Sequence, residues 1–129
     1  MTYCVGIKVN EGMVFASDRR TNAGLDNFNS YSKMFVHKGI DRNIIVLTSG
    51  NLATSQAVFN SITKDLEDDK NGNNLNNLFN LNEIAKYIGR LNVKHSSPDG
   101  INQETIELCS TFIDGGHIND QESELYLVY

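Results

Sequence analysis

The chain opens with Met1-Thr2-Tyr3-Cys4-Val5-Gly6-Ile7-Lys8-Val9, and this stretch decides the fold. Apolar residues occupy every odd position from Tyr3 to Val9, which is the period of two that a β-strand requires. Most domains begin with a few loose polar residues, whereas this strand begins directly after Thr2. The hydroxyl of Thr2, and its amine once Met1 is removed, would therefore be held at the edge of a sheet.

Length and charge restrict the class of protein. With 129 residues, 40% of them apolar, residues 1–129 are expected to form one globular domain. The net charge of -5 and the lack of a basic block argue against a nucleic-acid partner, because such partners are bound through clustered Lys and Arg. No apolar run is long enough for a bilayer and no signal sequence opens the chain, so we expect a cytoplasmic protein with no membrane partner.

Periodicity predicts four strands, two helices and two more strands, which is an antiparallel α+β arrangement. The expected strands are residues 3–9, 13–16, 34–37, 44–48, 105–113 and 125–129. The expected helices begin after the N-cap Asn51 and after Asn80, which with Glu83 resembles a capping box. Residues 67–77 are predicted to be a solvated connection with nothing to bury, and residues 114–117 a hairpin loop.

The two helices can cover only one face of a sheet, and the last predicted strand, residues 125–129, is apolar throughout. A further layer is therefore expected. Either the natural chain is longer, or a partner chain supplies the layer.

Four residues at strand ends could carry chemistry: Thr2, Asp18, Lys33 and Gly50. A threonine hydroxyl is a weak nucleophile, but an N-terminal threonine can use its own α-amine, with a pKa of about 7.7–8.0, as the base. Lys33 could hold down the proton affinity of that amine, and Asp18 could keep the lysine charged and oriented. Gly50 stands where a strand gives way to a helix, so its N–H could stabilise an oxyanion.

Each of these residues also has an ordinary interpretation. Threonine is a common second residue, Asp18 could belong to a loop ion-pair cluster, Lys33 could be solvated, and Gly50 could serve backbone geometry alone. Spacing by itself does not bring the four together.

The motifs in combination resemble the 20S proteasome β-subunit superfamily, and within it the bacterial proteasome-like proteins called Anbu. The resemblance is specific from Thr2 to about Asn60 and weaker from Ser110 to Tyr129. The motifs that carry it are Thr2, Ala16-Ser17-Asp18-Arg19-Arg20-Thr21-Asn22-Ala23-Gly24, Lys33-Met34-Phe35 and Thr48-Ser49-Gly50-Asn51-Leu52-Ala53-Thr54.

This resemblance implies an N-terminal-nucleophile hydrolase fold, an αββα sandwich of antiparallel sheets that is incomplete here, with one helical layer of two helices. It places the nucleophile on Thr2, its acidic partner on Asp18, its lysine on Lys33 and its oxyanion glycine on Gly50. It also implies that the backbone at Asn22 pairs with an extended peptide substrate. The serine and aspartate that support the amine in the family fall in a second half that this chain lacks.

No cofactor is expected, since neither a GxGxxG nor a Walker pattern occurs, and no metal site, since the three histidines lack ligand spacing. Cys4 and Cys109 are interpreted as reduced core thiols rather than a disulfide or metal pair.

Three hypotheses of function remain at this stage. The first is a threonine peptidase subunit acting on peptides or unfolded proteins within a homo-oligomer. The second is an inactive proteasome-like assembly or scaffold protein, and the third is a small binding module.

Overall fold

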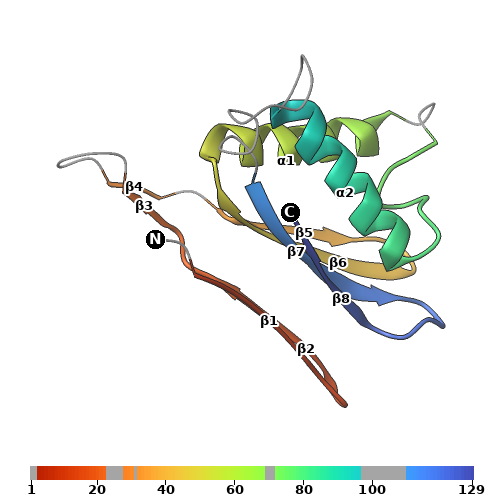
Figure 1. The fold of residues 1–129 in the computed structure, drawn as a ribbon. Helices are drawn as coiled ribbons and strands as arrows, with labels where there is room; N and C mark the ends of the chain where they lie inside the picture. The colour runs from red at the N-terminus through yellow and green to blue at the C-terminus, as the bar shows by residue number, and fades with distance from the viewer. Residues whose placement is uncertain (1–2, 23–27, 31, 69–71, 97–109) are drawn as a thin grey trace.

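The structure is a computed structural model that describes residues 3–22, 28–30, 32–68, 72–96 and 110–129. Strands β1 (Cys4–Val9) and β2 (Gly12–Ser17) pair antiparallel as a hairpin, as the alternation predicted. Strands β3 (Arg20–Asn22) and β4 (Phe28–Ser30) form a second, short hairpin that projects from the body beyond the end of β2 (Figure 1). The sequence had indicated only a polar loop there.

A second sheet has four antiparallel strands in the order β5-β6-β7-β8. They are β5 (Met34–Lys38), β6 (Arg42–Gly50), β7 (Ser110–Ile118) and β8 (Glu124–Val128). Strand β6 is central, as its continuous apolar run predicted. Its side chains at Ile44, Val46 and Leu47 are fully buried.

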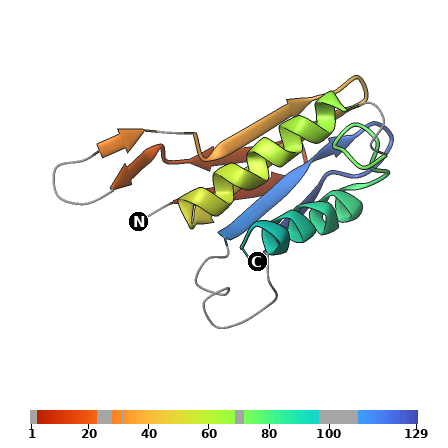
Figure 2. The ribbon, with the colours of Figure 1, turned by 90° about the horizontal axis from the view of Figure 1, so that it is seen from above.

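Helices α1 (Leu52–Glu67) and α2 (Leu81–Ser96) lie together over one face of this sheet (Figure 2). Both predicted caps are present: Asn51 Oδ1 accepts from the N–H of Thr54 at 3.1 Å, and Asn80 Oδ1 accepts from the N–H of Glu83 at 2.8 Å. The main core lies between these helices and the sheet. It is built from Ile44, Val46, Val58, Ile62, Leu75, Leu78, Leu81, Ile84, Tyr87, Ile88, Leu91, Phe112 and Ile118.

The β1–β2 hairpin packs on the opposite face of the four-stranded sheet, and two glycines allow the approach. A Cβ on Gly6 would lie 2.9 Å from Leu125 Cδ1, and one on Gly115 would lie 2.6 Å from Phe15 Cζ. Both distances are shorter than real Cβ contacts, so the Phe15 ring and the β8 side chain fit only where side chains are absent.

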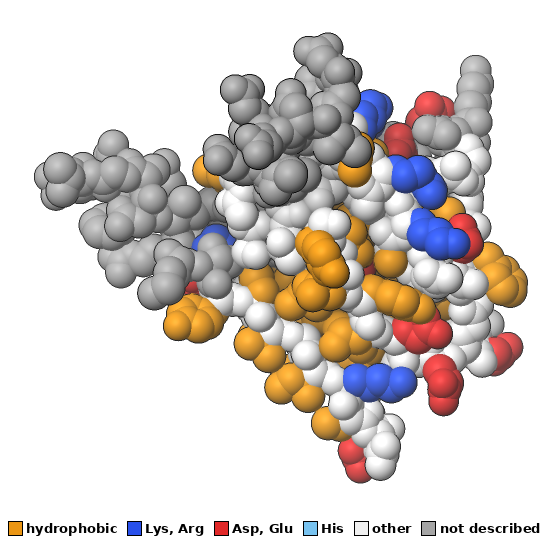
Figure 3. Space-filling model, viewed as in Figure 1, with side chains coloured by type: hydrophobic (Ala, Val, Ile, Leu, Met, Phe, Trp, Pro, Cys, Tyr) orange, Lys and Arg blue, Asp and Glu red, His pale blue; other side chains and the backbone are white. Residues whose placement is uncertain are grey.

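The outward face of the hairpin is apolar and exposed. Tyr3, Val5, Ile7 and Val9 have exposed fractions of 45–69%. In Figure 3 hydrophobic side chains form a row along the lower left edge, where the β1–β2 hairpin of Figure 1 lies. Leu127 of β8, on the sheet face that carries the hairpin, is also 61% exposed. Among the described residues the helices thus cover one face of the β-sandwich and leave the other bare, in agreement with the expected single helical layer.

Two expectations for the connections are wrong. Residues 114–117 are not a hairpin loop, because β7 continues to Ile118 and the turn to β8 follows it. The solvated connection also buries side chains: Leu75 is 0% exposed, and Arg42 donates to the carbonyls of Leu75 and Leu78 at 2.9 and 2.6 Å. The predicted strand residues 105–109 lie outside the described residues.

Among the described residues, no helix has the length and apolar character needed to cross a membrane.

Candidate active site

The most enclosed charged pair of the described chain joins two predicted site residues. Lys33 Nζ donates to Asp18 Oδ1 at 2.8 Å, and the lysine is 2% exposed while the aspartate side chain is 32% exposed. The sequence placed these residues 15 positions apart in loops, where both could have been solvated. The structure instead buries the lysine and points its ammonium at the carboxylate.

The fold aligns both members of this pair. Asp18 comes directly after β2, and Lys33 comes directly before β5. The carbonyl of Lys33 accepts from the N–H of Thr48 at 3.0 Å, which ties it to the central strand β6. The hydrogen bond from the Lys33 ammonium, with the attraction of its charge, holds the pKa of Asp18 below its ordinary value.

The beginning of β1 meets the same pair. The N–H of Asp18 donates to the carbonyl oxygen of Tyr3 at 3.0 Å, extending the ladder of β1 and β2 by one step. Tyr3 directly follows the predicted nucleophile in the sequence. Thr2 itself lies outside the described residues, so its predicted role stays a prediction.

Cys4 links the hairpin to β6 at this end of the molecule. Its Sγ donates to the carbonyl of Thr48 at 3.3 Å, and Cys4 is a free thiol. Burial, with a further contribution from the Asp18 carboxylate, raises the pKa of this thiol. The sequence had assigned Cys4 only to the core, although its even position in β1 already placed it on the inner side. Cys109 lies outside the described residues.

Gly50 ends β6 and precedes the N-cap of α1, as predicted. Its φ of 108° lies in the region that favours glycine. Successive N–H groups of a strand point to opposite sides, and the N–H of Thr48 points to Lys33. The N–H of Gly50, two residues on, therefore points to the same side of β6 as Lys33.

Asn22 is placed differently. It is the last residue of β3, and its backbone pairs with Phe28 on the projecting arm (Figure 1). The structure thus gathers Asp18, Lys33, Tyr3 and the end of β6 at one end of the sheets, with Asn22 on an adjoining arm.

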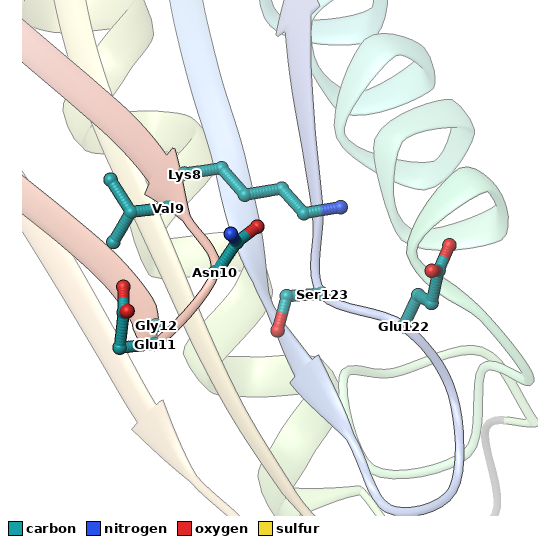
Figure 4. A pocket seen from close by; sticks show the side chains of 7 residues that line it. All are labelled: Lys8, Val9, Asn10, Glu11, Gly12, Glu122 and Ser123. Atoms are coloured by element: carbon teal, nitrogen blue, oxygen red, sulfur yellow. The ribbon is translucent and has the colours of Figure 1, made fainter.

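Concave surface occurs elsewhere on the molecule. A pocket of about 480 Å³ lies between the tip of the β1–β2 hairpin and the turn after β7 (Figure 4). It is lined by Lys8, Val9, Asn10, Glu11, Gly12, Glu122 and Ser123. This pocket is at the end of β1 away from Tyr3, so it is separate from the Lys33–Asp18 pair. In the described part of the chain, no three His, Cys, Asp or Glu side chains are grouped to hold a metal ion.

Known proteins resemble this chain in both sequence and structure. The family described as Proteasome subunit matches residues 2–123. Proteasome subunit beta 1 of Saccharolobus islandicus strain M.14.25 is 32% identical over 93 residues, which is 72% of this chain and 36% of that protein. Proteasome subunit beta 2 of Saccharolobus solfataricus strain P2 is 30% identical over the same length.

Solved structures of Anbu proteins match the whole chain. Anbu, the ancestral beta-subunit, from Yersinia bercovieri superposes with a TM-score of 0.88 at 27% identity, and the Anbu complex of Pseudomonas aeruginosa, described as a helical assembly, with 0.86 at 32%. The match covers 100% of this chain but 53% of each solved chain. The chain thus spans about half the length of these Anbu chains and 36% of the curated relative.

The two-helix layer on antiparallel sheets, with the Anbu structures as neighbours, confirms the N-terminal-nucleophile hydrolase type of fold expected from the resemblance. The family match over residues 2–123 and the 32% identity to a proteasome beta subunit agree with that fold, and the chain belongs to the proteasome subunit family.

Proposed function

We propose that this chain is a threonine-type peptide hydrolase subunit whose nucleophile is Thr2 after removal of Met1. The observation that carries the proposal is the buried Lys33 ammonium, 2.8 Å from Asp18 and tied by its backbone to β6. Burying a lysine costs several kcal/mol unless a partner holds it, so a lysine kept there indicates a use for its charge.

In the proposed reaction the Thr2 hydroxyl attacks the carbonyl carbon of a peptide bond while the Thr2 α-amine takes the hydroxyl proton. The positive charge of Lys33 disfavours protonation of the resting amine, and Asp18 keeps Lys33 charged and oriented. The Thr2 α-ammonium formed in this step then gives its proton to the leaving amine as the C–N bond breaks, which leaves an ester on Thr2. A water molecule, deprotonated by the same amine, hydrolyses the ester and regenerates the hydroxyl.

Two backbone elements complete the proposal. The N–H of Gly50 stabilises the oxyanion of the tetrahedral intermediate, and its direction toward the Lys33 side of β6 supports this role. The backbone of Asn22 on β3 pairs with an extended substrate by adding a strand to the arm. The substrate class is then a peptide or unfolded protein. We further propose a homo-oligomer, which the helical assembly of the Pseudomonas aeruginosa relative supports. The proposed location is the cytoplasm.

Two measurements test the nucleophile. Intact mass and N-terminal sequencing must show Thr2 at the amino terminus, and retention of Met1 on the purified protein would refute the mechanism, because an amide nitrogen cannot act as the base. A peptide bearing an electrophilic group must then label the wild type at Thr2 and fail to label Thr2→Ala. Labelling that survives the substitution would favour the scaffold hypothesis.

A further inference from the structure

A chain of buried hydroxyl groups lies beneath the junction of β6 and α1. Thr48 Oγ1 lies 2.7 Å from Ser55 Oγ, and Ser55 Oγ lies 2.8 Å from Ser110 Oγ. Ser110 Oγ in turn donates to the carbonyl oxygen of Asn51 at 2.8 Å. The three hydroxyl residues are 1–2% exposed, and they come from β6, α1 and β7.

The donor and acceptor of each hydrogen bond among these hydroxyl groups follow from counting their hydrogens. A carbonyl oxygen only accepts, so the single hydroxyl hydrogen of Ser110 is used on Asn51. Ser55 must therefore donate to Ser110, and Thr48 must donate to Ser55. All three O–H dipoles then point along one path to the Asn51 carbonyl, and such aligned bonds strengthen one another.

Helix α2 holds the backbone of Ser110 in this arrangement. The Asn92 side chain, 2% exposed, donates from Nδ2 to the Ser110 carbonyl at 2.7 Å and accepts from the Ser110 N–H at 3.1 Å. This two-point contact fixes the backbone of Ser110, the residue that pairs with Gly50 across β6 and β7. Ser110 is thus held by α2 through its backbone and holds Asn51 through its side chain.

The network acts on the turn that contains Gly50. The Asn51 carbonyl accepts from Ser110 Oγ and from the N–H of Ser55 at 3.0 Å, so its peptide plane is fixed from two sides. Gly50, with its φ of 108°, directly precedes Asn51, whose Cα atom begins this plane. Apolar side chains could fill the same core at comparable stability, so four buried polar side chains at this place indicate a requirement for geometry.

We infer that Ser110 and Asn92 are positioning residues of the active site proposed above: they hold the Gly50–Asn51 turn so that the Gly50 N–H is aimed at the reacting carbonyl. The inference rests on the proposed function. It assigns a role to β7 and α2, elements that supply none of the predicted catalytic groups.

The test compares two serine-to-alanine variants. Ser110→Ala removes the bond to Asn51, while Ser61→Ala removes a bond between α1 and α2, from Ser61 Oγ to His95 Nε2 at 2.6 Å, away from the turn. Reaction with the electrophilic peptide gives a maximal labelling rate, kinact, and a binding constant, KI. We expect Ser110→Ala to lower kinact by about 10-fold at an unchanged KI, which is less than the 10²–10³ that complete loss of an oxyanion donor costs. Ser61→Ala should keep the wild-type kinact.

Ser55→Ala gives a graded control, because Ser110 keeps its donation to Asn51 and loses only the donor behind it. Its kinact should fall between those of the wild type and Ser110→Ala. Equal rates for wild type and Ser110→Ala, or equal losses in Ser110→Ala and Ser61→Ala, would overturn the positioning role while leaving the proposed function intact. A wild type that is not labelled would instead refute the proposed function, and the positioning role with it.

Hydrogen exchange supplies a readout that needs no activity. The amides of Thr54 and Ser55, which donate to the side chain and to the carbonyl of Asn51, should exchange faster in Ser110→Ala than in wild type, while those in the middle of α1 keep their protection. Unchanged exchange at Thr54 and Ser55 would show that the Ser110 hydroxyl does not hold the turn, and would overturn the inference.

Discussion

A buried carboxyl in β7 gives the sharpest prediction about stability. Asp114 is 2% exposed, and neither of its carboxyl oxygens has a hydrogen-bond partner among the described residues. It lies between Val46 of β6 and Tyr126 of β8. Burial raises the pKa of Asp114 well above its ordinary value, since water no longer solvates the charged form.

The sign of the pH dependence follows from this shift. In the unfolded chain an aspartate has a pKa of about 3.9, so between that value and the raised folded pKa the native state binds a proton that the unfolded state has lost. Stability from this group is therefore fully present below about pH 3.9 and declines as pH rises, by about 1.4 kcal/mol for each pH unit between the two pKa values.

Asp114→Asn removes the ionisation with little change of shape. The free energy of unfolding is measured in urea by circular dichroism at about pH 4.5 and 5.5. The difference between Asp114→Asn and the wild type should shift in favour of the variant by about 1.4 kcal/mol from the lower to the higher pH. Groups common to both proteins, such as the His95 imidazole, whose pKa burial lowers, cancel in the comparison.

Asp41→Asn is the matched control for this experiment. In the wild type, the hydrogen bond from Arg42 holds the pKa of Asp41 below its ordinary value. The stability that the Asp41 carboxylate contributes is therefore present above the unfolded pKa and is lost only as pH falls below about 4. Between pH 4.5 and 5.5 its difference from the wild type should stay constant. If the Asp114→Asn and wild-type stabilities also ran parallel there, the carboxyl would be solvated or partnered, and the argument from burial would be wrong.

Three further predictions follow from the site and the sheet contacts. Lys33→Met should lower the labelling rate by about 10²–10⁴, which is the usual contribution of a group that assists proton transfer. Lys38→Met, at the exposed end of β5, should leave the rate unchanged. Equal rates for the two variants would refute the role of Lys33. Gly50→Ala should destabilise the fold by about 1–3 kcal/mol in urea, because its φ of 108° strains any side chain, whereas Gly72→Ala, where a Cβ meets nothing within 4 Å, should cost far less. Gly115→Ala should cost about 1–3 kcal/mol by forcing Phe15 aside, and Phe15→Leu in the same chain should recover part of the loss in a double-mutant cycle; additive losses would show that the two residues do not compete for space.

Local signals in the sequence were sufficient for most of the elements. The alternation in β1, the apolar run of β6 and the caps at Asn51 and Asn80 each depend on neighbours within a few residues, and the structure contains all of them. The resemblance supplied what spacing alone did not, namely that Asp18 and Lys33 meet.

The wrong predictions concern segments whose local structure depends on contacts with residues far away in the sequence. Gly115 and Gly116 were interpreted as a turn, but Gly115 lacks a side chain because Phe15 of β2 occupies that space. Leu75 was assigned to a solvated connection, but Arg42 holds its carbonyl over the core. In both cases the partner is far away in the sequence, so no local window contains the signal.

The hydroxyl chain was missed for a related reason. Thr48, Ser55 and Ser110 are common residue types that form no sequence motif. Their hydroxyl groups meet only because β6, α1 and β7 pack together.

The tight fit around Gly6 has a consequence for how the β1–β2 hairpin pairs. Strand β1 is apolar on its outer face and partly so on its inner face, so hydrophobicity alone would barely oppose a slip by one residue. A slip would put Val5 or Ile7 in place of Gly6, where even a Cβ lies 2.9 Å from Leu125 and 3.2 Å from Ile113. Steric exclusion at Gly6 thus sets the register of β1. An absent side chain in the middle of β1 thereby ensures that the Tyr3 carbonyl, three residues earlier, meets the N–H of Asp18.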